Sequence, residues 1–170
     1  LLLYSIFKNE DNFELKSFVY KYFEVSENPA SGYQTPTEFS ILDHIDTLWS
    51  VLTRSDIDKR KVGSLIPLPH NYIVPGGRFK EIYYWDSYFT ILGLLKSGRD
   101  SMALNMVQNF AYLIDEYGFI PNGNRDYYLS RSQPPFFSLM VEALAKNDST
   151  LYLSHLNHLL KEYSFWMSGR

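Results

Sequence analysis

Hydrophobic side chains repeat at helical spacing through most of this 170-residue chain, and this repeat limits the folds open to it. The first clear case covers residues 38–53, where one face of a helix would carry Leu42, Ile45, Leu48, Trp49 and Leu52. Two starts satisfy capping-box chemistry, one at Thr35 with Glu38 and the other at Ser40 with Asp43. No stretch shows convincing strand alternation. The pattern therefore predicts an all-α fold.

Further helices are expected over residues 85–97, 101–117, about 134–146 and about 150–166. Gly98 and Gly118 should end the first two of these, and Asp100 should cap the second. Pro134-Pro135 should open the third, and Ser149 or Thr150 the last.

Two long connections, residues 54–83 and 118–133, interrupt this series of helices. Paired antiparallel helices would bring both connections to one end of a solenoid or toroid. Residues 1–37 are poorly periodic, so we expect an irregular N-terminal region followed by a helical segment over residues 38–170. Loops on a rigid helical scaffold are common places for function.

Composition excludes several function classes. Sixteen basic and nineteen acidic residues give a net charge of -3, and the basic residues do not cluster, which argues against nucleic-acid binding. No apolar run approaches the roughly 18 residues needed to cross a membrane. The chain has no cysteine, and its four histidines show no metal-ligand spacing. We therefore expect no membrane span, no metal and no cofactor.

Two segments combine planar polar groups with aromatic rings, namely residues 75–88 and 120–135. Arginine forks, amides and a carboxylate can hold adjacent hydroxyls of a sugar, and Trp85 offers a face for stacking. Each feature also has an ordinary structural explanation: Gly76-Gly77 as a turn, Trp85 as core, and each arginine in an ion pair. A catalytic role for the pair Glu81 and Asp86 is the less favoured interpretation, because carboxylates that are neighbours in sequence are commonly solvated or salt-bridged.

The first segment reads PGGRFKEIYYWDSY and matches every specified position of Pro-Gly-Gly-Arg-Phe-x-Glu-x-Tyr-x-Trp-Asp-x-Tyr, a signature of the glycoside hydrolase family 37 α,α-trehalases. The second, IPNGNRDYYLSRSQPP, resembles the corresponding trehalase segment. The resemblance extends through HIDTLWSVLTR and EYSFWMSG and weakens before about residue 13.

This resemblance implies an (α/α)6 toroid and an inverting enzyme that hydrolyses trehalose to two glucose molecules. The implied sugar-binding residues are Arg78, Trp85, Asp86, Asn122, Arg131, Ser132 and Gln133. Trehalases carry their general acid in a later Ser-Gly-Trp-Asp segment and their general base nearer the C-terminus. Neither is found in residues 1–170, so we expect an N-terminal portion of a single catalytic domain, without catalytic residues of its own.

Other possibilities stay open at this point. A catalytically inactive fragment that binds sugar weakly or not at all is the main alternative, and a helical interaction module is a third. By resemblance, the substrate is trehalose and the complete enzyme is a monomer. Both cytoplasmic and periplasmic relatives exist; a cytoplasmic location is expected because no signal segment is visible, with the periplasm as the alternative.

Overall fold

The computed structural model describes residues 13–23, 33–55, 63–146 and 148–169. Its helices are α2 (Leu15–Tyr22), α3 (Ile41–Val51), α4 (Tyr84–Lys96), α5 (Asp100–Tyr117), α6 (Phe137–Ala145), α7 (Thr150–Ser154) and α8 (Leu156–Met167). A single 3-10 turn, Asp126–Tyr128, and two short strands complete the described elements. The described part is mostly helical, as predicted. None of its helices combines the length and the apolar character that crossing a bilayer requires.

The chain divides into two units, Leu1–Gln34 and Thr35–Arg170. In the first unit, Glu14 caps α2 by accepting a hydrogen bond from the Ser17 backbone N–H at 3.1 Å. Phe18 is the buried residue of this helix, and the Phe13, Tyr22 and Phe23 rings lie within 6 Å of it. This helix lies where we expected an irregular segment. Two turns of helix give too few repeats for the periodicity to be recognised.

In the second unit, α3 begins at the second of the two predicted starts. Ser40 and Asp43 form a reciprocal capping box, in which each side chain accepts a hydrogen bond from the other residue's backbone N–H. Trp49 joins this helix to the end of α4, because its indole N–H donates to Ser97 Oγ at 3.1 Å. Arg99 and Asp46 add an ion pair at 2.6 Å between the same two regions.

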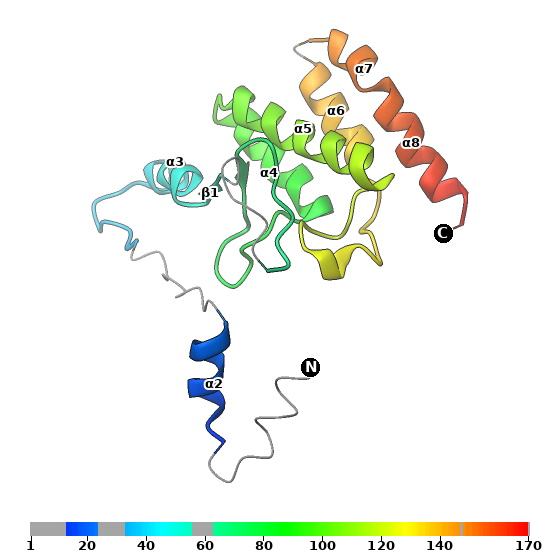
Figure 1. Cartoon of the computed structure of the whole chain (residues 1–170). Helices are drawn as coiled ribbons and strands as arrows, with labels where there is room; N and C mark the ends of the chain where they lie inside the picture. Colours follow the sequence, from blue (N-terminus) through cyan, green and yellow to red (C-terminus); the bar gives the residue numbers. More distant parts are fainter. Residues whose placement is uncertain (1–12, 24–32, 56–62, 147, 170) are drawn as a thin grey trace. The chain divides into compact units, whose positions relative to one another are not determined.

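The core lies among α4, α5 and α6, which pack on one another, with α8 along α5 (Figure 1). Tyr84, Phe110 and Phe137 are among the largest of its side chains and are essentially inaccessible to solvent. Residues 66–74 contribute Ile66, Leu68 and Tyr72 to the same cluster. The connection that we expected to be irregular is therefore partly core. It also contains the two strands, because β1 (Thr53–Arg54) pairs antiparallel with β2 (Tyr72–Ile73).

Several helix ends differ from the prediction. Asp100 is the first residue of α5 rather than its cap, and Arg99 occupies the cap position without a capping hydrogen bond from its side chain. Pro134-Pro135 precede α6, which begins at Phe137. The expected last helix is interrupted at His155. Its ring and the Ser154 hydroxyl both hydrogen-bond to the Leu151 carbonyl, an arrangement that competes with the helical ladder.

Candidate functional site

The two motif segments lie side by side at one end of the helices (Figure 1). An isolated antiparallel bridge pairs Tyr83 with Gly123, and the Tyr84 N–H donates to the Asn122 carbonyl at 3.2 Å. Within the second segment, the Asn122 N–H donates to the Arg131 carbonyl at 3.0 Å. The backbone therefore brings both predicted sugar-binding segments to the N-terminal end of α4.

Two glycine positions make these segments possible. Gly76 and Gly77 adopt φ angles of 94° and 58°, a region that other residues rarely enter, so the chain turns sharply there. Gly123 is needed for a different reason: a Cβ at this position would lie 2.8 Å from the Ile82 carbonyl oxygen. The turn predicted at Gly76-Gly77 is thus present, and the close approach at Gly123 sets the spacing between the segments.

Buried polar side chains join the segments a second time. Asn124 is fully buried; its Oδ1 accepts from the Ile82 N–H and its Nδ2 donates to the Ile66 carbonyl, both at 3.0 Å. Glu81 is 7 % exposed and binds Arg125, with 2.7 Å from Nε to Oε1. Glu81 is therefore an internal ion-pair residue that links the loops.

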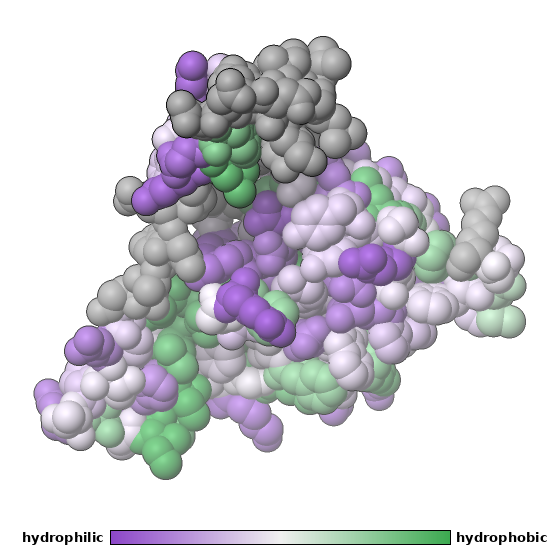
Figure 2. All heavy atoms as spheres, turned by 90° about the horizontal axis from the view of Figure 1, so that it is seen from below, coloured by the Kyte–Doolittle hydropathy of each residue, from purple (hydrophilic) through white to green (hydrophobic). Residues whose placement is uncertain are grey.

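Trp85, Asp86 and Gln133 meet at the start of α4. The Gln133 side chain accepts a hydrogen bond from the Trp85 N–H at 3.1 Å and donates from Nε2 to Asp86 Oδ2 at 3.4 Å. These residues line a pocket of about 260 Å³, which is completed by Pro75, Phe79 and Tyr83. Hydrophilic and hydrophobic residues are both present on the molecular surface seen from below (Figure 2). The pocket lining likewise combines polar and aromatic side chains, which suits a small polar ligand with apolar faces.

The other predicted site residues do not line this pocket. Arg78 is exposed, and its guanidinium lies over the Phe79 ring at 4.9 Å. Arg131 is also exposed and lies over the Tyr128 ring at 5.0 Å. Ser132 turns its hydroxyl to the Ile120 carbonyl at 2.7 Å, which fixes the loop. Asn122 contributes its backbone to the junction and is half-buried.

Phe79 and Tyr83 line the pocket but were absent from the predicted set. Both belong to the first motif, and their rings meet edge to face at 5.5 Å. Burial, the hydrogen bond to Tyr128 and the nearby Glu81 raise the pKa of Tyr83 above its usual range. Its hydroxyl donates to Glu81 Oε2 at 3.3 Å and lies 3.1 Å from the Tyr128 hydroxyl. Position within the motif was the only sequence signal for either residue.

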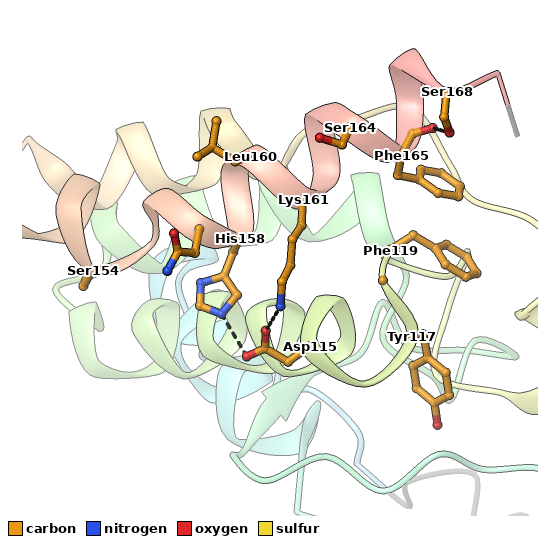
Figure 3. A pocket seen from close by; sticks show the side chains of 12 residues that line it. Asp115, Tyr117, Phe119, Ser154, His158, Leu160, Lys161, Ser164, Phe165 and Ser168 are labelled. Carbon is orange, nitrogen blue, oxygen red and sulfur yellow. Dashed lines mark hydrogen bonds and ion pairs between the residues drawn. The ribbon is translucent and has the colours of Figure 1, made fainter.

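A larger groove of about 960 Å³ lies elsewhere, between the end of α5 and α8 (Figure 3). Its charges are already paired, since Asp115 binds Lys161 at 2.6 Å and His158 at 3.0 Å. Those two contacts lower the pKa of Asp115, with Lys161 the stronger cause. Phe119 and Phe165 stack at its end. We favour the smaller pocket, because both motif segments converge there.

The described ranges contain no group of three or more side chains suited to hold a metal ion. The smaller pocket has one carboxylate, Asp86, on its lining. Its lining offers a carboxylate and an amide, which can meet hydroxyl groups, and three aromatic side chains, which can cover apolar ring faces.

The trehalase family model matches residues 6–170. Periplasmic trehalases from Escherichia coli O1:K1 and from strain K12 are 53% and 52% identical to this chain over 167 residues. Each match covers 98% of the chain and 29% of the relative, so the chain spans less than a third of the relatives' length.

A solved neutral trehalase from Saccharomyces cerevisiae is also similar. It is 51% identical over the matched region, which covers 45% of this chain and 14% of that protein, with a TM-score of 0.44. The family model covers nearly the whole chain and agrees with the two motifs whose side-by-side arrangement is described above. The chain belongs to the trehalase family.

Proposed function

We propose that this chain forms part of an α,α-trehalase, and that its two motif segments hold one sugar unit of trehalose. The observation that carries the proposal is the convergence of Trp85, Asp86 and Gln133, from both segments, on one pocket. Asp86 and Gln133 would bind adjacent hydroxyls, and Trp85 would cover an apolar face of the sugar. Arg78, Asn122, Arg131 and Ser132 would complete the binding set.

In an inverting glycosidase, a general acid protonates the glycosidic oxygen while a base activates a water on the opposite face. The two carboxyl groups stand about 6.5–9.5 Å apart. Asp86 is hydrogen-bonded to Gln133, which suits it to hold sugar rather than to shuttle protons. The acid and base of the proposed reaction would come from outside these 170 residues, and the pocket would orient the bond toward them.

The proposal includes the arrangement of helices and the compartment. The packing of α4, α5 and α6 with α8 along α5 is consistent with part of an (α/α)6 toroid. The relatives named above are periplasmic trehalases, which favours the periplasmic alternative; the expected cytoplasmic location has no support. The substrate, trehalose, and a monomeric state of the complete enzyme are part of the same proposal.

A chimera tests the proposed function. This chain would replace the matching segment of the Escherichia coli periplasmic trehalase, to which it is 52% identical, and glucose release from trehalose would be measured. We expect hydrolysis by the chimera and strong loss with Asp86→Asn. Asp115→Asn is the matched control, because it changes a carboxylate of the larger groove. A folded chimera that releases no glucose, or equal effects of the two substitutions, would contradict the proposal.

A further inference from the structure

Glu162 is a buried acid that the proposed binding set does not use. It lies on α8 and is 5 % exposed. Burial raises the pKa of Glu162 to about 7, while a hydrogen bond from Tyr84 acts in the opposite direction. A buried ionisable side chain usually has a hydrogen-bond or ion-pair partner.

The partner of Glu162 lies in the first turn of α4. The Tyr84 hydroxyl donates to Glu162 Oε1 and is itself fully buried. The Tyr84 hydroxyl oxygen also accepts hydrogen bonds from the Phe136 and Phe137 N–H groups, both at 2.9 Å. The hydroxyl thus has its one donor and two acceptor positions occupied. Through this atom, α8 is joined to α4 and to the start of α6.

Two parts of this network are close in sequence to pocket residues. Tyr84 directly precedes Trp85 and Asp86, and Phe136 is three residues after Gln133. Gln133 in turn binds the Trp85 N–H and Asp86. A rotation of the Tyr84 ring would release the start of α6 and with it the segment that carries Gln133. Glu162 holds that ring by accepting its only proton.

We infer that Glu162, acting through Tyr84, is a positioning residue that fixes Gln133 and Asp86 for sugar binding. The inference rests on the proposed function, because it assigns a role in the same site. Glu162 touches neither the pocket nor a ligand, and its effect is carried by the Tyr84 hydroxyl and the two backbone N–H groups. What matters is an oxygen acceptor at this position rather than its charge.

Two substitutions in the chimera distinguish the effect of the hydrogen-bond acceptor at position 162 from the effect of its negative charge. Glu162→Gln keeps a carbonyl oxygen for Tyr84, whereas Glu162→Met fills the space with a thioether, which is only a weak acceptor. Loss of one such hydrogen bond corresponds to about a tenfold effect. We expect Glu162→Met to lower kcat/KM for trehalose about tenfold, mainly through KM, and Glu162→Gln to stay within about threefold of the parent.

Phe165→Leu supplies the control for general destabilisation of α8. Phe165 stacks on Phe119 at 4.8 Å in the larger groove and makes none of the contacts in the Tyr84 network. The Phe165→Leu substitution should lower Tm while leaving kcat/KM for trehalose unchanged. Equal losses of activity in Glu162→Met and Phe165→Leu, or equal losses in Glu162→Met and Glu162→Gln, would overturn the inference.

Hydrogen exchange gives a readout that does not depend on catalysis. In the chimera, Glu162→Met should speed exchange at the Phe136 and Phe137 amides about tenfold, and Glu162→Gln should not. An inactive chimera would contradict the proposed function, whereas unchanged exchange at these amides would overturn the positioning role. Faster exchange without any change in kcat/KM would overturn it too.

Discussion

Removing the guanidinium of Arg125 should destabilise the junction between the two motif segments. Arg125 Nη2 lies 2.6 Å from Glu81 Oε1, and only 9 % of the Glu81 side chain is exposed. Without Arg125, this carboxylate would keep the Lys80 N–H at 3.1 Å and the Tyr83 hydroxyl at 3.3 Å. Arg125→Met retains much of the aliphatic volume, so the lost charge is the main change.

The expected magnitude follows from burial. Breaking a buried ion pair from one side costs about 3–5 kcal/mol. Because 26 % of the Arg125 side chain is exposed, water can reach part of the vacated space, and we expect about 2–3 kcal/mol. Adding Glu81→Gln should recover about 1–2 kcal/mol, since an unpaired amide is less costly to bury than an unpaired carboxylate.

Urea unfolding of the 170-residue chain at pH 7, followed by circular dichroism, measures these differences. Arg99→Met is the matched control: Arg99 also binds its partner, Asp46, at 2.6 Å, but the two side chains are 35% and 66% exposed. Its cost should stay below about 1 kcal/mol. Additive effects of Arg125→Met and Glu81→Gln, or equal costs for Arg125→Met and Arg99→Met, would refute the reasoning.

Three further outcomes are expected. The pKa of Glu162 is raised from 4.5 to about 7, so Glu162 contributes about 3 kcal/mol to the free energy of unfolding below pH 4.5. This contribution is lost as the pH rises through 7. The free energies of unfolding of the parent and of Glu162→Gln, measured as a function of pH, should therefore diverge between pH 4.5 and 7. In the chimera, Arg131→Ala should lower kcat/KM about 10- to 200-fold without lowering Tm, and near-normal turnover would contradict its assignment. The 170-residue chain alone should release no glucose from trehalose, because its pocket presents one carboxylate and inversion needs two.

Helix α5 could be predicted from sequence because burial of one face imposes its spacing directly. Helix α3 was also predicted from its spacing, although none of its residues is buried. Gly98 and Gly118 follow α4 and α5 as expected. The break at His155 could not be predicted, since it depends on side chains that bond to a carbonyl of the preceding turn. The small sheet was missed for a similar reason: strands of two residues carry no alternation.

The site was predicted only in part. The motifs identified both segments, but the approach of Gly123 to Ile82 and the pairing of Glu81 with Arg125 join residues more than 40 positions apart. Spacing along the chain does not encode such contacts. Glu162 was missed because it lies on a helix whose sequence reads as an ordinary amphipathic stripe. Whether the seven proposed residues bind sugar stays a prediction.

The bond between Tyr84 and Glu162 also constrains the order in which the protein matures on the ribosome. Its two residues are 78 positions apart. At about 5–20 residues per second, α4 is made roughly 4–16 seconds before α8 can supply the acceptor. During that interval the Tyr84 hydroxyl lacks this acceptor. The pocket should therefore reach its final geometry late in synthesis, after the helices around it have already formed.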